Sequence, residues 1–229
     1  MADPYPPELE HCRACPRLAE HREAIAAGRI MRRNAYQDEP YWGKPIPGFG
    51  DRGARIMLLG LAPGAHGSNR TGRMFTGDSS GRFLYAALHG AGLANLPESA
   101  HRNDDLRLSD VWITAACRCV PPGNKPTRAE IDTCRHWLEH DFRLLAHLRV
   151  VVALGRVAHD AYLELLNSRG RRVIKSEYPF SHGALHDIGS AFTLLDSYHV
   201  SFQNTNTGKL TAEMFAGILE RAKAIAAGQ

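Results

Sequence analysis

The sequence predicts a three-layer α/β/α fold with a central, mainly parallel sheet of four strands, formed by one domain that spans residues 1–229. Four short runs rich in apolar and β-branched residues, at 55–61, 110–116, 149–154 and 192–200, have the length and composition of buried strands. Helical patterns lie between or after them, and this alternation favours a parallel sheet covered on both faces. A chain of 229 residues that is 44% hydrophobic can bury one substantial core.

Four helices are expected around this sheet. The first starts near Ser80, with Ser79 or Ser80 as its N-cap. The second begins at Thr127, where Thr-Arg-Ala-Glu forms a capping box: the Thr127 hydroxyl and the Glu130 carboxylate satisfy the first free amides. The others span 156–166 and 211–226.

The composition indicates where the protein is located, but says little about any chemistry that it carries out. The formal net charge of +4 is compatible with a polyanionic partner but does not require one. The N-terminus carries prolines and charges where a signal peptide needs an apolar run, and no stretch approaches the roughly 20 apolar residues of a membrane span. We therefore expect a cytoplasmic protein with no membrane partner.

The five cysteines indicate a metal or cluster site, because a disulfide framework is not expected in a reducing compartment. Cys12 and Cys15 form a C-x2-C pair before a predicted helix, which lets both chelate one centre from a single turn. Cys119 follows the second strand, and Cys134 lies early in the capped helix. Three alternatives remain open at this point. Zinc could bind to the same thiolates in place of an iron–sulfur cluster, and Cys117 could be a ligand in place of Cys119. The cysteines could also be unrelated residues of the core.

Loops rich in Gly, Pro, Asn and Thr follow three of the strands, at 62–79, 117–126 and 201–210. Open parallel sheets bind ligands at this edge. The first loop is neither G-x4-G-K-[ST] nor G-x-G-x-x-G, which removes the best support for a nucleotide cofactor. Three residues at this edge have two interpretations each. Phe75 either packs the loop onto the core or stacks on a flat base. Asp78 is either a helix cap or a catalytic residue, and His199, at a strand end, is either structural or catalytic.

Polar and basic residues around this edge are candidates for DNA contacts. The tract after His199 supplies hydrogen-bond donors for backbone phosphates. Positive charge is available from Arg70, Arg73, Lys125 and Lys209.

Together these segments resemble the uracil-DNA glycosylase superfamily, in particular its iron–sulfur branches and, among those, the fifth family (type B). The matching motifs are Gly-Leu-Ala-Pro-Gly from Gly60, His-Gly-x-Asn-Arg-Thr-Gly-Arg-Met-Phe-Thr-Gly-Asp from His66, Cys-Val-Pro-Pro-Gly-Asn-Lys-Pro from Cys119, and Tyr-His-x-Ser-x-Gln-Asn-Thr-Asn-Thr-Gly from Tyr198. Each motif alone is weak, but their order and spacing over most of the chain are specific.

The resemblance implies a monofunctional DNA glycosylase of base excision repair in a prokaryote. Such an enzyme flips uracil out of the duplex, excises it by hydrolysing the N-glycosidic bond, and leaves an abasic site. Hypoxanthine and xanthine are further expected substrates, and the protein is expected to be a monomer. The resemblance also implies a structural [4Fe–4S] cluster. The family ligand directly precedes Val-Pro-Pro, which leaves Cys117 free and gives the ligand set Cys12, Cys15, Cys119 and Cys134.

The resemblance also implies roles for single residues. Phe75 stacks on the flipped base, and Asn124 and His199 match active-site residues. Independently of the resemblance, we take Asp78 as the candidate for positioning water, so the expected catalytic set is Asp78, Asn124 and His199. The remaining expected substrate contacts are Gly60, Leu61, Ala62, Pro63, Gly64 and His66. The expected DNA contacts are Asn69, Arg70, Arg73, Lys125, Ser201, Gln203, Asn204, Thr205, Asn206 and Thr207, of which 203–207 match the loop that fills the space left in the duplex.

Two departures leave alternatives open. Related branches place Asp, Asn or Glu where this chain has Leu61 and Ala62, an absence that the fifth family shares, and Val200 replaces the usual proline of His-Pro-Ser. A DNA-binding protein that has lost its chemistry is therefore one alternative, and a metal-dependent hydrolase with Cys and His ligands is another. No lysine near the first motif suits Schiff-base chemistry, so we expect base removal without strand cleavage.

Overall fold

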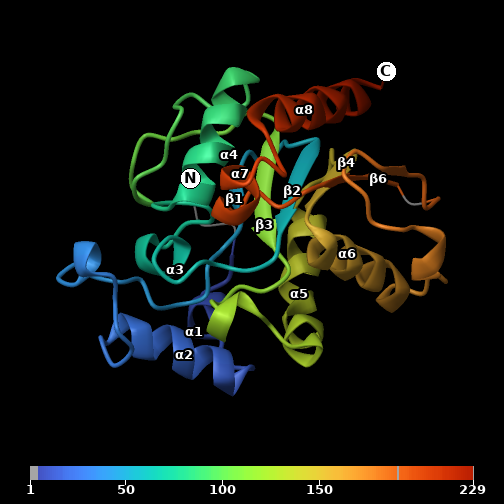
Figure 1. The fold of residues 1–229 in the computed structure, drawn as a ribbon. Helices are drawn as coiled ribbons and strands as arrows, with labels where there is room; N and C mark the ends of the chain where they lie inside the picture. Colours follow the sequence, from blue (N-terminus) through green and yellow to red (C-terminus); the bar gives the residue numbers. More distant parts are fainter. Residues whose placement is uncertain (1–4, 190, 229) are drawn as a thin grey trace.

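A mixed β-sheet lies at the centre of the protein, whose computed structural model describes residues 5–189 and 191–228 (Figure 1). Within these residues the sheet has six strands in the order β1-β3-β2-β4-β6-β5. The four central strands run parallel, and β1 and β5 pair antiparallel at the two edges. The strands are β1 (Phe49–Gly50), β2 (Ile56–Gly60), β3 (Val111–Ala115), β4 (Val150–Leu154), β5 (Leu185–His186) and β6 (Thr193–Ser197).

Helices cover both faces of this sheet, as the alternation of strand and helix predicts. Helices α4 (Ser79–Gly90) and α8 (Ala212–Ala227) pack on one face, and α5 (Arg128–Leu144) and α6 (Arg156–Ser168) pack on the other (Figure 1). Outside these layers lie α1 (Glu8–His11), α2 (Pro16–Ala26), α3 (Ser68–Thr71) and α7 (Phe202–Asn206). Three short 3-10 turns cover Asn34–Tyr36, Pro122–Asn124 and Lys175–Glu177.

Each central strand is buried on both faces, which explains its near-continuous apolar sequence. In β2, Ile56 and Leu58 pack into the core beneath α4 and α8, whereas Met57 and Leu59 pack into the core beneath α5 and α6. All four side chains are fully buried. The period-2 alternation of a strand therefore divides one run of apolar residues between two cores.

The structure confirms the predicted layers, the four parallel strands and the capping box at Thr127. It corrects three details. The sheet has two further edge strands, β1 and β5, which are too short at two residues each to give a period-2 pattern. The N-cap of α4 is Asp78 rather than a serine. Residues 202–206, expected in a loop, form the short helix α7.

The described residues contain no helix with the length and apolar character that a membrane crossing requires.

Candidate active site

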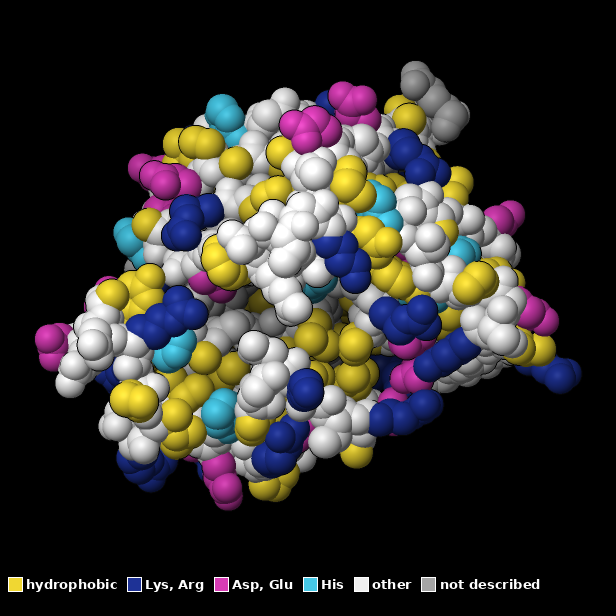
Figure 2. Space-filling view, in the orientation of Figure 1, with side chains coloured by type: hydrophobic (Ala, Val, Ile, Leu, Met, Phe, Trp, Pro, Cys, Tyr) yellow, Lys and Arg dark blue, Asp and Glu magenta, His cyan; other side chains and the backbone are white. Residues whose placement is uncertain are grey.

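A crevice of about 570 Å³ opens where the parallel strands end. It is lined by parts of the loops after β2, β3 and β6, segments that lie far apart along the chain. Figure 2 shows a hollow in this face, with hydrophobic side chains inside and Lys and Arg side chains around its rim. Ten residues that the sequence predicts for the site line it: Leu61, Ala62, Gly64, His66, Phe75, Asp78, Asn124, His199, Ser201 and Gln203.

Phe75 has an unusual backbone conformation, with φ of 51° in the left-handed region. Its amide donates a hydrogen bond to Oγ of Ser68 (3.0 Å), and its ring lies so close to Gly60 that a Cβ there would sit 3.0 Å from the ring. Gly81 is also required beside it, since a Cβ at that position would lie 1.8 Å from the Phe75 carbonyl oxygen. The surroundings thus hold a strained conformation that presents the ring to the crevice, as is typical of functional sites.

His199 follows β6 and faces Phe75, with 6.2 Å between the ring centroids and 37° between the ring planes. The side-chain amide of Asn204 donates from Nδ2 to the backbone carbonyl of His199 (2.8 Å), which fixes the turn. Burial lowers the pKa of His199 to about 4, so the imidazole is neutral at pH 7. No described residue forms a hydrogen bond with the ring nitrogens, which leaves them available to a ligand.

Asp78 carries out a structural task at the entrance of α4. One carboxylate oxygen accepts a hydrogen bond from the Gly81 amide (2.9 Å) as the helix cap. The other lies against the glycine-rich loop: a Cβ at Gly67 would be 2.1 Å from it, and one at Gly64 would be 3.2 Å away. Burial raises the pKa of Asp78, while the amides of Ser80 and Gly81 oppose this rise.

His66 and Asn124 complete the wall and the mouth of the crevice. The ring of His66 is oriented by Tyr41, whose hydroxyl lies 2.9 Å from Nδ1, and burial lowers the pKa of His66. Asn124 ends the 3-10 turn after β3 with φ of 57°, next to Gly123 with φ of 61°. This double left-handed turn leaves the Asn124 side chain exposed at the mouth of the crevice.

Three of the residues expected to contact DNA instead hold the protein together. Asn69 is buried and its amide donates to the carbonyl of Arg22 (3.4 Å). Arg73 is buried against Asp104, and Arg70 is ion-paired with Glu39. These three side chains therefore have partners within the protein, and a loop motif in the sequence carries no information about the direction of its side chains.

The other predicted residues lie around the crevice. Gly60 is buried beneath the Phe75 ring, and Pro63 is buried in the first loop. Lys125 is exposed, and Lys209 lies over the ring of Tyr198 at 4.8 Å. The remaining positions lie on or next to α7 at the rim, at Asn204, Thr205, Asn206 and Thr207.

Ten further residues line the crevice without having been predicted as site residues, and three of them bear on its chemistry. Arg33 lines the crevice from a segment far from the loop motifs, and Ser68 both lines it and anchors Phe75. Phe202 is 60% exposed at the start of α7. Of these three residues, only Phe202 could have been predicted from the sequence, because an aromatic residue within a polar tract is unusual.

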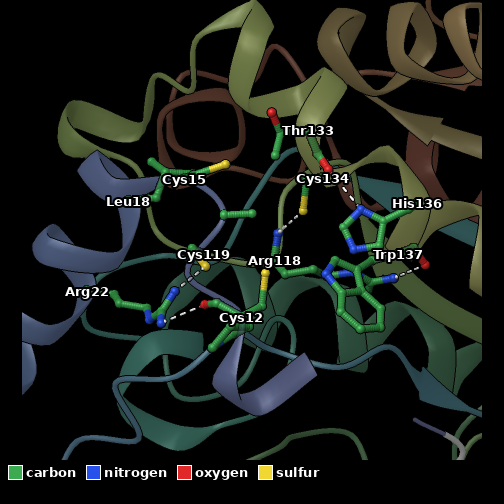
Figure 3. Close-up of a pocket in the computed structure, with 12 residues that line it drawn as sticks. Cys12, Cys15, Leu18, Arg22, Arg118, Cys119, Thr133, Cys134, His136 and Trp137 are labelled. Carbon is green, nitrogen blue, oxygen red and sulfur yellow. Dashed lines mark hydrogen bonds between the residues drawn. The ribbon is translucent and has the colours of Figure 1, made fainter. Parts of the chain in front are cut away.

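A second, smaller pocket gathers the four cysteines that the resemblance assigns to a cluster (Figure 3). Cys15 is the N-cap residue of α2, and Cys12, Cys119 and Cys134 come from the turn before it, the loop after β3 and α5. Cys117 does not line this pocket; it is fully buried beside Cys134.

Two N–H groups point at sulfur atoms of this pocket. Arg22 donates from Nη1 to Sγ of Cys119 (2.9 Å), and the amide of Arg118 donates to Sγ of Cys134 (3.3 Å). The Arg118 guanidinium pairs in turn with the buried carboxylate of Asp141. Donors of this kind stabilise negative charge on sulfur and are a regular feature of sites where thiolates bind metal.

The distances between these sulfur atoms bear on the kind of metal centre that they could hold. Zinc held by four thiolates, with Zn–S bonds of about 2.3 Å, places the sulfur atoms roughly 3.8 Å apart. Among the described residues, no three of these sulfur atoms lie within 4.8 Å of one another, although side-chain atoms of His159, His186 and Asp196 do. The four thiols therefore line one pocket without the close sulfur spacing of a single-ion site in this structure.

Comparisons with known proteins agree with this geometry. The profile of the Uracil DNA glycosylase superfamily matches residues 47–223. The chain is 54% identical over 218 residues to the type-5 uracil-DNA glycosylase of Thermus thermophilus, covering 95% of both chains. Identity is 49% over 216 residues to that of Mycobacterium tuberculosis (94% of this chain, 78% of the relative) and 42% over 222 residues to that of Pyrobaculum aerophilum (97% and 92%). The chain belongs to the uracil-DNA glycosylase superfamily and, within it, to the type-5 family.

Proposed function

We propose that this chain excises uracil from DNA by hydrolysing the N-glycosidic bond and leaves an abasic site for base excision repair. The observation that carries this proposal is the convergence of Phe75, Asn124 and His199 on one crevice in a member of this superfamily. A base inside a duplex is out of reach of such a crevice, so the nucleotide must first be extruded, at a cost of a few kcal/mol. Damaged or mispaired bases unpair more easily, which favours lesions from the start.

The crevice offers the extruded base an aromatic surface for stacking and a polar side chain that can form hydrogen bonds with its edge. The Phe75 ring presents an aromatic face that is held in place by its strained backbone and by Gly60. Asn124 has both a donor and an acceptor in its side-chain amide and reads the edge of the base. The mouth position of Asn124 supports this role.

His199 stabilises the leaving group. As the bond between C1′ and N1 breaks, the sugar gains positive charge and the uracil gains negative charge on O2. A neutral imidazole donates a hydrogen bond to that oxygen, and a preorganised donor in a dry site contributes about 2.7–4 kcal/mol to lowering the barrier. The lowered pKa and the unoccupied ring nitrogens of His199 support this assignment.

Asp78 orients the attacking water and balances the cationic sugar. One of its carboxylate oxygens is committed to capping α4, so the second oxygen carries this role. Leu61 and Ala62 line the same wall and exclude bulk water, which strengthens the electrostatic contributions.

We also propose base removal without strand cleavage and a substrate range wider than uracil. A lyase step needs an amine nucleophile, and no lysine lines the crevice among the residues that the structure covers. The aliphatic wall at Leu61 and Ala62 lacks polar groups that select one base edge, which favours hypoxanthine and xanthine as additional substrates. Lys125 and the exposed residues of α7 are the proposed contacts to the DNA backbone.

The test is excision from a labelled duplex that contains one uracil, followed by alkali to cleave abasic sites. The protein should give an alkali-dependent product and none without alkali. A protein that binds this duplex but gives no product at high enzyme excess is a DNA-binding protein on the same fold, and the proposal is then wrong. Product that disappears with a chelator while the fold persists would point to a metal-dependent hydrolase instead.

For the cysteine pocket we propose a structural [4Fe–4S] cluster bound by Cys12, Cys15, Cys119 and Cys134. The gathering of the four thiols in one pocket and the two N–H donors support it. When bound, the cluster crosslinks the turn before α2, the loop after β3 and α5. This link matters for the crevice because the same loop after β3 carries Asn124.

Two serine variants form a matched pair for this cluster. Cys119→Ser should abolish the brown colour and the iron and sulfide content, because it removes a ligand. Cys117→Ser, two residues away and outside the pocket, should keep both. Stoichiometric zinc in a colourless wild-type protein would overturn the cluster, and equal iron loss in both variants would overturn the ligand assignment.

A further inference from the structure

Arg33 is the positively charged residue of the crevice. Among the described residues that line it, no other is Lys or Arg, and both crevice histidines have a lowered pKa. The guanidinium is exposed, and no described carboxylate pairs with it. Its positive charge opposes the rise that burial causes in the pKa of Asp78, and adds to the fall that burial causes in the pKa of His66.

The segment that carries Arg33 is firmly anchored. We call residues 27–43, which connect α2 to the first edge of the sheet, the strap. Arg32 donates from its guanidinium to the carbonyls of Gln37 (2.8 Å), Ile25 (3.1 Å) and Glu39 (3.1 Å) and so ties the strap to the end of α2. Its neighbour Arg33 is therefore presented to the crevice from a fixed backbone.

The far end of the strap is bound to the loop that forms the crevice wall. The amide of Trp42 donates to the carbonyl of Arg70 (2.9 Å), and Arg70 pairs with Glu39 and lies over the ring of Tyr36 at 4.0 Å. Tyr41 meets His66 from the same segment. Arg33, which lines the crevice, has no carboxylate partner among the residues that the structure describes.

An extruded nucleotide brings its two flanking phosphates to the mouth of the crevice, where the carboxylate of Asp78 repels them. A guanidinium binds phosphate with two parallel hydrogen bonds and offsets this repulsion. We propose that Arg33 binds a backbone phosphate next to the extruded nucleotide, and that the strap holds Arg33 in the position for this contact. This inference rests on the proposed DNA substrate.

The test measures binding to a duplex with one 2′-fluoro-deoxyuridine, which resists excision, over a series of salt concentrations. Arg33→Ala should weaken binding about tenfold near 0.1 M salt. It should also lower the slope of log K against log salt by about 0.9, the contribution of one phosphate. Arg33→Lys should keep the slope, since it keeps the charge. Arg149→Ala removes an equal charge just before β4, at the end of the parallel strands opposite the crevice, and should leave affinity and slope unchanged.

An unchanged slope in Arg33→Ala overturns the inference, as does an equal change in Arg149→Ala. A variant that keeps the slope but loses preference for uracil over cytosine shows that Arg33 reads the base instead, which also overturns it. Excision of uracil by the wild-type protein is scored separately on an ordinary uracil duplex, so failure of the proposed function is distinguishable from failure of the phosphate contact.

Discussion

His199 should stabilise the leaving uracil as a neutral hydrogen-bond donor. Burial moves its pKa from the ordinary 6.5 to about 4. Lowering the pKa this far disfavours the imidazolium by about 3 kcal/mol, at about 1.36 kcal/mol for each tenfold change in the protonation equilibrium. At pH 7 only about one His199 in a thousand is charged, compared with about one in four for an ordinary histidine. The chemistry proposed here therefore uses the neutral ring.

Replacing His199 with alanine should slow single-turnover excision at saturating DNA by about 10²- to 10³-fold, the effect of removing one preorganised donor. His199→Gln, which keeps a donor, should recover part of the rate. DNA affinity should change little in both variants, because the donor acts on charge that develops only in the transition state. If affinity collapses while the single-turnover rate survives, His199 is a binding residue and this reasoning fails.

The same shift predicts how stability depends on pH. The folded pKa lies below the unfolded one, so the unfolded state binds more protons between these values. The free energy of unfolding should therefore fall as pH drops from 6.5 to 4, with His199 contributing up to about 3 kcal/mol of the loss. His199→Gln should remove that contribution in denaturant titrations across this range. An NMR titration with the His199 pKa at or above 6.5 would contradict the neutral-donor account.

Two further predictions concern groups that hold the site in place. Gly67→Ala sets a Cβ 2.1 Å from the Asp78 carboxylate, whereas Gly64→Ala sets one at 3.2 Å. The first should cost about 1–3 kcal/mol in urea unfolding and the second clearly less; equal costs would contradict the packing argument. Asp141→Asn leaves the buried Arg118 guanidinium without its counter-charge and should cost about 3–5 kcal/mol. A loss under about 1 kcal/mol would show that this pair contributes little.

The sequence predicts the fold where the signal is local. The strand around Ile56 is found because both of its faces are buried, which makes the whole run apolar. The start of α5 is found because Thr127 and Glu130 satisfy the first amides by themselves. The pair Phe49–Gly50 is a strand only because β3 lies beside it, and no pattern of two residues contains that information.

The site is predicted in part for the same reason. Phe75 and His199 stand out because an aromatic ring among glycines and a histidine at a strand end are local features, and both line the crevice. Arg73 has the right type and position in the motif, but its guanidinium turns inward to Asp104. Arg33 reaches the crevice through hydrogen bonds between distant segments, and these can be found only in three dimensions.

The most direct test of the central claim is a crystal structure of this protein with a duplex that contains 2′-fluoro-deoxyuridine. The account predicts that the uracil lies outside the helix stack, in the crevice, with its ring against Phe75 and its O2 within hydrogen-bond distance of a ring nitrogen of His199. A uracil bound elsewhere on the protein, or left stacked in the duplex with the crevice empty, would contradict it.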